Sequence, residues 1–227
     1  MFDDLSQVER RYEELAYRMT TPEAMNDPAA YAAMMREYKE LTPLVETYRS
    51  YTALQKEVGL PVKPDVPLMV MVTRLASHKG LDLLCYIARR LIWEEDAQLL
   101  ILGTGEAQYE SFFKDLANQF PDQVSAQITF NLGLAARIYA GGDIYLMPSK
   151  SEPCGLSQMN AMRYGTVPVV HATGGLKDTV PPADENGEGG LGFTFQSYNA
   201  DDFFASLKRC LGLYNHNREA FRALQKR

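Results

Sequence analysis

Two cations stand close together in a segment that opens a helical stretch, and this arrangement suits the binding of an anion. Arg74 and Lys79 lie five residues apart in the string Thr73-Arg-Leu-Ala-Ser-His-Lys79-Gly80, directly after an apolar run. Basic side chains and the unpaired N–H groups at a helix start both favour negative charge. The string therefore predicts an anion site, with a solvated surface loop carrying incidental cations as the alternative.

A second segment combines a carboxylate with free backbone donors. Glu152 is followed by Pro153, Cys154, Gly155, Leu156 and Ser157, where another helical stretch begins. The carboxylate can accept hydrogen bonds from sugar hydroxyls, and the N–H groups of residues 154–157 can donate to a phosphate. Two alternatives stay open: Glu152 can compensate a helix dipole, and Cys154 can pack as a small buried hydrophobe.

Glycine-rich turns and one aromatic residue complete the set of candidate binding residues. Gly103 lies in the string Gly103-Thr104-Gly105, and Gly174 and Gly175 open another helical stretch. Backbone without side chains allows a ligand to approach closely. Phe130 could offer a flat face to a base, although core packing is the commoner use of such a residue.

The elements that must position these residues alternate along the chain from about residue 68. Apolar runs predict strands at Leu68–Thr73, Gln98–Leu102, Ala126–Phe130, Asp143–Met147, Val167–His171 and Gly192–Phe195. Between and after them, helical patterns are predicted at about 80–93, 106–119, 133–141, 155–164, 175–180 and 200–214. Strands that alternate with helices indicate an α/β fold with a doubly wound parallel sheet, in the order 3-2-1-4-5-6. Ligands bind beyond the carboxyl ends of the strands in such sheets, which is where the candidate residues fall.

The first 57 residues follow a different pattern. Leu5, Val8, Tyr12 and Leu15 recur at helical spacing, and a second helical pattern runs from Asp27–Pro28 to Val58. Pro43 lies inside this second run and is expected to kink it. The sheet domain is therefore expected to be preceded by an α-helical hairpin, and a packing or spacer role is the plainest interpretation of that hairpin.

Composition excludes several classes of protein. The 227 residues carry a formal charge of −6, which argues against binding to nucleic acid. No run approaches the length of a membrane span, and the charged N-terminus is unlike a signal peptide. The three cysteines are widely and irregularly spaced, which predicts neither disulfides nor a metal site. A cytoplasmic protein that does not associate with membranes is expected.

From about residue 53 onward the chain resembles the C-terminal domain of bacterial glycogen synthases. The likeness rests on Arg74-Leu-x3-Lys79-Gly80-Leu-Asp-Leu, Ile138-Tyr-Ala-Gly-Gly-Asp143, Ser149-x2-Glu152-Pro-Cys-Gly-Leu-x-Gln158, Arg163-Tyr-Gly-Thr-Val-Pro168 and Thr173-Gly-Gly-Leu-x-Asp178-Thr-Val. These enzymes are retaining glycosyltransferases of the GT-B fold that use ADP-glucose to extend an α-1,4-glucan. The sequence departs from the family pattern at Lys150-Ser151, where Arg-Phe is usual, and at Leu132 and Asn160.

The resemblance implies a role for each candidate residue. Arg74 and Lys79 would neutralise the leaving diphosphate, and Glu152 would contact the donor glucose. The amides of residues 154–157 and of Gly174 and Gly175 would hold hydroxyls and phosphate, Gly103 would border the nucleotide, and Phe130 would lie near the adenine. The expected ligand is therefore ADP or ADP-glucose, with no separate cofactor.

Residues 1–52 resemble the opening helices of bacterial peptide chain release factor 1. The matching strings are Met1-Phe-Asp-x-Leu5, Arg11-Tyr-Glu-Glu-Leu15 and Glu37-Tyr-x-Glu-Leu-x-Pro43-Leu-Val-Glu-x-Tyr48. Two domains follow, residues 1–52 and 53–227, joined within one helix by an engineered fusion or a gene rearrangement. Because the acceptor domain of the glycosyltransferases is replaced, the chain is expected to bind nucleotide sugar without transferring glucose. The alternatives are a structural spacer with a vestigial pocket and an enzyme completed by a partner chain.

Overall fold

A six-stranded parallel sheet forms the centre of the larger part of the chain in this computed structural model, which describes residues 3–21 and 27–227. The strands are β1 (Leu68–Val72), β2 (Gln98–Leu102), β3 (Val124–Gln127), β4 (Ile144–Met147), β5 (Val167–His171) and β6 (Phe193–Phe195). Their order is β3-β2-β1-β4-β5-β6, and every neighbouring pair is parallel. The predicted fold class and strand order are confirmed.

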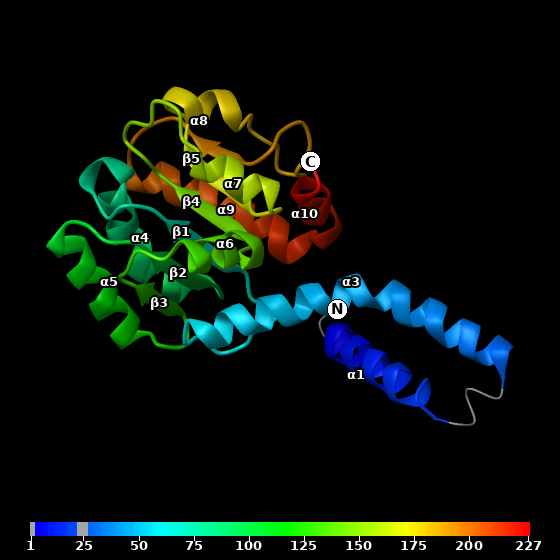
Figure 1. Ribbon diagram of the computed structural model, residues 1–227. Coiled ribbons are helices and arrows are strands. Elements are labelled where there is room, and N and C mark those ends of the chain that lie inside the picture. The colour runs from blue at the N-terminus through cyan, green and yellow to red at the C-terminus, as the bar shows by residue number, and fades with distance from the viewer. Residues whose placement is uncertain (1–2, 22–26) are drawn as a thin grey trace. The chain divides into compact units, whose positions relative to one another are not determined.

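Helices follow the strands, as the alternating pattern predicts (Figure 1). They are η1 (Ser77–Lys79), α4 (Leu81–Glu94), α5 (Ala107–Gln119), α6 (Leu132–Gly141), α7 (Ser157–Arg163), α8 (Gly174–Thr179), α9 (Ala200–His216) and α10 (Arg218–Gln225). The last helical stretch is divided in two at Asn217, whose side chain accepts a hydrogen bond from the Ala220 N–H at 3.1 Å. Such an amide side chain caps the start of a new helix.

Alternate residues of each strand bury opposite faces of the sheet. Met69 and Met71 of β1 belong to the core that includes the apolar faces of α4, α5 and α9. Leu68 and Val70 are equally buried and face the other way, where α6 packs on β1 and α7 on β5. Both faces are thus covered, and the free ends of the strands are left to the loops. None of the helices in the described ranges combines the length and the apolar character needed to cross a membrane.

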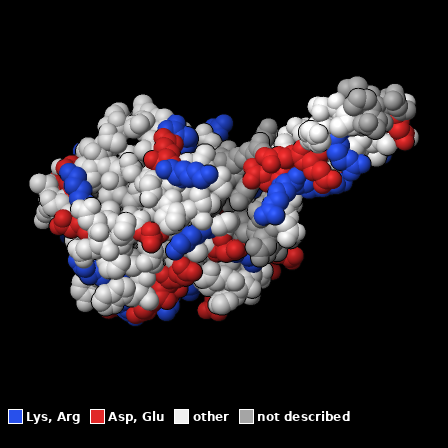
Figure 2. Space-filling view, turned by 90° about the horizontal axis from the view of Figure 1, so that it is seen from below, with Lys and Arg blue, Asp and Glu red and all other residues white. Residues whose placement is uncertain are grey.

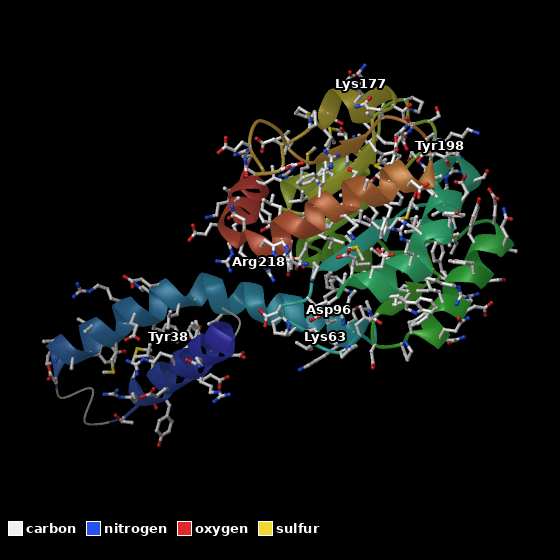
Figure 3. The ribbon with its side chains drawn as sticks, turned by 180° about the vertical axis from the view of Figure 1, so that it is seen from behind. Tyr38, Lys63, Asp96, Lys177, Tyr198 and Arg218 are labelled. Atoms are coloured by element: carbon white, nitrogen blue, oxygen red, sulfur yellow. The ribbon has the colours of Figure 1, made fainter. Side chains whose placement is uncertain are left out.

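The amino edge of the sheet is held together by buried and partly buried polar side chains. Gln98 is fully buried, and its Nε2 donates to the carbonyls of Pro61 at 2.9 Å and Asp122 at 3.3 Å. The Asp143 carboxylate accepts from the Leu68 N–H at 2.8 Å. Burial raises the pKa of Asp143 to about 6, and the Leu68 bond and the charge of Arg218 oppose that rise. Figure 3 shows Asp96, just before β2, at this edge.

Contacts divide the chain into two units: Met1–Ala53 with Val62–Asp65, and Leu54–Pro61 with Val66–Arg227. In the first unit, α1 (Asp3–Arg18) lies beside the first part of α3 (Pro28–Glu57), as the expected hairpin requires (Figure 1). The rings of Tyr12 and Tyr38 stack at 4.2 Å, and Arg11 pairs with Glu37 at 2.8 Å. The helical assignment of α3 continues through residues 51–53, and a boundary there stays a prediction.

One strand prediction is wrong in position. β3 spans Val124–Gln127 and not residues 126–130, because Val124 and Ser125 are buried and pair with Leu99 and Leu100 of β2. Phe130 therefore lies beyond the strand end, in the segment that leads to α6.

On the face drawn in Figure 2, positive and negative side chains of the second unit lie in small mixed groups.

Candidate functional site at the carboxyl edge of the sheet

Four loops meet at the carboxyl edge of the sheet. They are the cation loop (73–80) after β1, the GTG loop (103–106) after β2, the carboxylate loop (148–156) after β4 and the glycine turn (172–175) after β5. Figure 3 shows Lys177 of α8 and Tyr198 at the end of the unit that lies away from Asp96. Because every strand is parallel, residues that are far apart in sequence come together here.

The cation loop and the GTG loop are joined backbone to backbone. Leu75 N–H donates to the Thr104 carbonyl at 2.9 Å, and Glu106 N–H donates to the Leu75 carbonyl at 2.7 Å. A Cβ atom on Gly103 would overlap the Thr73 carbonyl, and one on Gly105 would overlap the Leu75 carbonyl. These glycines allow two loops of the protein to approach each other, which the sequence-based interpretation had assigned to ligand approach.

The cation loop also packs on the carboxylate loop. Gly80 has φ of +75°, and a Cβ atom there would overlap the Pro148 carbonyl. The Lys150 N–H donates to the His78 carbonyl at 2.9 Å. A left-handed glycine in close backbone contact is the local reason that this loop can fold as it does. The two contacts flank Lys79 and fix its position beside the carboxylate loop.

Lys79 and Glu152 form a direct ion pair. Lys79 Nζ lies 2.5 Å from Glu152 Oε2, and the two side chains are only 17% and 12% exposed. Water screens such a pair much less than it screens a surface pair. Arg74, from the same loop as Lys79, is exposed. The arrangement can bind an anion next to a hydrogen-bonding carboxylate, and an incoming anion must compete with Glu152 for Lys79.

The carboxylate loop is fastened to the glycine turn. Gly175 N–H donates to the Glu152 carbonyl at 3.0 Å, so that amide is already used within the protein. Cβ atoms on Gly174 and Gly175 would overlap the carbonyls of Glu152 and Cys154. The Gly175 amide therefore has an acceptor within the protein, and its binding to a ligand stays a prediction, as does that of Gly174.

The remaining predicted residues at this edge differ in exposure, and Gly155 among them is buried. Cys154 is an exposed free thiol, and Leu156 is 69% exposed. Ser157 is partly buried, and its hydroxyl lies 3.5 Å from Met147 Sδ. Phe130 is 81% exposed, so it does not pack in the core. An exposed ring near the strand ends can stack against a planar ligand.

The contacts of two polar residues at this edge, His171 and Tyr198, were not foreseen. His171, at the end of β5, is buried, and its ring nitrogens face the carbonyls of Ser149 at 2.8 Å and Gln196 at 3.3 Å. The Tyr198 hydroxyl donates to Asp82 at 2.6 Å, and partial burial together with that carboxylate raises its pKa. Lys150 Nζ lies 5.7 Å from the Tyr198 ring centroid. A histidine that closes an otherwise apolar strand was the available sequence signal.

No group of three or more histidine, cysteine or carboxylate side chains is placed to hold a metal ion within residues 3–21 and 27–227. The described site instead offers cationic side chains, a carboxylate and backbone. The site is therefore suited to a ligand that carries both an anionic group and hydroxyl groups.

The doubly wound sheet, with the cation–carboxylate pair at its carboxyl edge, defines an α/β domain of the class whose ligands bind beyond the carboxyl ends of the strands. Comparison with known families makes this more specific. The model of the family "Glycosyl transferases group 1" matches residues 55–226, and the chain belongs to this family.

Curated relatives include glycogen synthases of two bacteria. The one from Exiguobacterium sibiricum is 47% identical over 203 residues, covering 83% of this chain and 42% of that protein. The one from Bacillus licheniformis is 45% identical over 205 residues, covering 89% of this chain and 41% of that protein. The chain thus spans about two fifths of the length of these relatives and is homologous to part of each.

A solved structure supports the same assignment. The catalytic domain of Starch Synthase IV from Arabidopsis thaliana, bound to ADP and acarbose, superposes with a TM-score of 0.73 at 32% identity. The match covers 79% of this chain and 38% of that one. The domain therefore has the GT-B type of glycosyltransferase fold.

Proposed function

We propose that residues 53–227 bind ADP and ADP-glucose and form the donor half of a retaining glycogen or starch synthase. The observation that carries this proposal is the meeting of Lys79 with Glu152, at 2.5 Å, where the loops after β1 and β4 converge. Lys79 and Arg74 would neutralise the diphosphate, and Glu152 would accept hydrogen bonds from glucose hydroxyls. The starch synthase structure that holds ADP supports this choice of nucleotide.

The other predicted residues take subsidiary places in the proposal. The amides of Cys154, Gly155, Leu156 and Ser157, with that of Gly174, would donate to phosphate and sugar oxygens. Phe130 would stack beside the adenine. Gly103 and Gly175 would contribute indirectly, because their close backbone contacts hold the neighbouring loops in place.

Calorimetric titration tests the proposal. The chain is expected to bind ADP and ADP-glucose, and the binding is expected to disappear in Arg74→Ala and in Lys79→Ala. Lys114→Ala is a matched control, because that exposed lysine lies on α5 and pairs only with Glu110 among the contacts described, at 3.9 Å. Circular dichroism checks that each variant keeps its fold. Binding that survives both substitutions would mean that the diphosphate lies elsewhere. If neither ligand binds, the spacer with a vestigial pocket becomes the better explanation.

We further propose that the 227 residues assayed alone transfer no glucose. Positioning donor and acceptor in a closed cleft supplies several kcal/mol of barrier reduction, and each loss of about 1.4 kcal/mol costs a factor of ten in rate. The chain spans only two fifths of its glycogen synthase relatives, which supports a need for further residues. Incorporation of labelled glucose from ADP-glucose into glycogen is the assay. Measurable elongation by the purified chain would contradict the proposal.

The helical hairpin carries a separate proposal. We propose a boundary between residues 52 and 53, with residues 1–52 a fused module of release-factor-like sequence. The internal pairing of Tyr12 with Tyr38 supports a hairpin that folds as a unit. The glycogen synthase alignments, which cover up to 89% of the chain, extend beyond what residues 53–227 alone could supply, and this weighs against the boundary. Expression of residues 53–227 is the test: the fragment is expected to fold and to bind ADP as the full chain does.

The proposed setting is the reducing cytoplasm. Cys85, Cys154 and Cys210 are all free thiols, and Cys154 is exposed. A free exposed thiol is readily oxidised outside a reducing compartment. Localisation of a fluorescent fusion in cells tests this part of the proposal.

A further inference from the structure

Gln158, in the first turn of α7, is fully buried beneath the carboxylate loop and holds that loop from the inside. Its Nε2 donates to the Gly155 carbonyl at 2.8 Å and lies 3.4 Å from the Cys154 carbonyl. The same nitrogen lies 3.0 Å from Thr179 Oγ1 of α8. One side-chain amide thus reaches two successive peptide carbonyls of the loop and a hydroxyl from the next helix.

Thr179 extends this connection to the glycine turn. Its hydroxyl donates to the Gly175 carbonyl at 2.6 Å, so its oxygen is left to accept from Gln158. The Gly175 N–H in turn donates to the Glu152 carbonyl. Gln158 and Thr179 therefore connect the carboxylate loop to the end of α8, and the Gly175 N–H connects it to the start of that helix.

The orientation of the loop amides follows from these contacts. In a trans peptide unit the C=O and the N–H point in opposite directions. Because Gln158 holds the Cys154 and Gly155 carbonyls toward itself, the N–H groups of Gly155 and Leu156 must point away from it. Within the described residues, neither N–H has a hydrogen-bond acceptor. They are therefore unpaired donors on the other side of the loop, where Leu156 is exposed and Gly155 is buried.

The other end of the Gln158 side chain indicates what the residue is for. Gln158 Oε1 is buried and has no hydrogen-bond partner among the described residues. Leaving a buried acceptor unpaired costs on the order of 1–3 kcal/mol. Gly155, at φ +67°, is also required, since a Cβ atom there would come within 2.5 Å of this oxygen. The amide nitrogen is the end that makes contacts, so the side chain acts as a donor to the loop.

We propose that Gln158 is a positioning residue of the donor site: by holding the carbonyls of Cys154 and Gly155, it turns the Gly155 and Leu156 amides toward the diphosphate of a nucleotide sugar. This inference rests on the proposed function. Gln158 itself does not touch the ligand and acts through the loop.

Gln158→Glu tests the inference, because it keeps the shape of the side chain but replaces the donor nitrogen by oxygen. An ionised carboxylate would repel the two carbonyls, whereas a protonated one could donate to one of them. Burial raises the pKa of an introduced carboxyl group, so the protonated form is reached at moderately low pH. The ratio of variant to wild-type ADP dissociation constants is expected to be about 30 near pH 8, and to fall at least threefold by about pH 5.5. Using the ratio cancels the titration of ADP itself.

Gln98→Glu is the matched control. Gln98 is equally buried and also donates to two backbone carbonyls, but it lies at the amino edge of the sheet. Its variant is expected to lose stability while its ADP ratio stays near one at both pH values. A generally destabilised protein would instead affect both variants alike.

Thr179 provides a milder second variant in case Gln158→Glu does not fold. Thr179→Val removes the hydroxyl at nearly constant shape and is expected to weaken ADP binding about three- to tenfold. Thr179→Ser restores the hydroxyl and is expected to restore the affinity. The inference would be overturned if Thr179→Val bound ADP as the wild type does and the ratio of Gln158→Glu to wild-type dissociation constants stayed near one at every pH.

A ligand-free measurement separates this inference from the proposed function. Amide hydrogen exchange of residues 152–158 is expected to be faster in Gln158→Glu than in the wild type, and unchanged in Gln98→Glu. If the wild type binds no ADP, the proposed function fails. Unchanged exchange of the loop in Gln158→Glu would show that Gln158 does not position it.

Discussion

Neutralising Glu152 should strengthen the binding of ADP, because the Glu152 carboxylate forms an ion pair with Lys79 and competes with the diphosphate for that cation. The contact is 2.5 Å long, with side chains only 17% and 12% exposed. A hydrogen bond between charged groups contributes about 1.5–3 kcal/mol when little water competes. ADP must give up part of that energy to engage Lys79. In Glu152→Gln the competing charge is gone, and we expect ADP to bind about tenfold more tightly, equivalent to about 1.4 kcal/mol.

Titration calorimetry near pH 7.5 measures this change, with ADP and ADP-glucose compared in parallel. ADP-glucose should gain less than ADP, because its glucose loses a charged acceptor in the variant. Glu94→Gln is the control, since Glu94 forms a surface ion pair with Arg90 on α4 and its variant should bind ADP as the wild type does. Weaker or unchanged ADP binding in a folded Glu152→Gln protein would refute the competition between Glu152 and the diphosphate.

Three further outcomes are expected. Iodoacetamide should label Cys154 first, since Cys210 is buried and burial raises the pKa of Cys85 to about 12. ADP should slow the labelling of Cys154, as measured by mass spectrometry. Equal labelling with and without ADP would show that this thiol lies outside the site. Asp143 has a folded pKa of about 6 against an ordinary 3.8, so its contribution to stability is full below pH 3.8 and is lost as pH rises through 6. In urea titrations, Asp143→Asn should therefore raise the free energy of unfolding by up to about 3 kcal/mol at neutral pH and change it little near pH 4. An equal change at both pH values would contradict this expectation. Gly80→Ala should destabilise the fold by more than about 2 kcal/mol and weaken ADP binding, because it forces a side chain into a left-handed backbone against Pro148. A melting temperature equal to that of the wild type would contradict this packing.

The strand order could be predicted from sequence because each strand is a short apolar run between helical stretches, and right-handed crossovers leave few arrangements. The edge strand β3 begins two residues and ends three residues before the predicted strand, since it is polar at Ser125 and Gln127 and the β-prone residues after it extended the apparent run. Pairing with β2 decides its true position, and that pairing is not visible in the local sequence.

The candidate site was foreseen less completely than the fold. Strand ends could locate Lys79 and Glu152 at one edge, because parallel strands bring their carboxyl ends together. Their ion pair could not be inferred, since it depends on how far each loop turns inward. The Gln158–Thr179 contact joins residues 21 positions apart through side-chain rotamers, and no periodicity reports it. The glycines were correctly noticed, but their neighbours are loops of the same protein.

Those backbone contacts between loops have a consequence for changing the specificity of the domain. Five glycines set the positions of the loops relative to one another without contributing any side chain: Gly80, Gly103, Gly105, Gly174 and Gly175. The geometry of the edge is thus encoded separately from the side chains that would select a ligand. Libraries that vary exposed Lys150, Ser151 and Asn160 while keeping these glycines should retain folded members at high frequency. Substrate preference could then diverge on an unchanged frame.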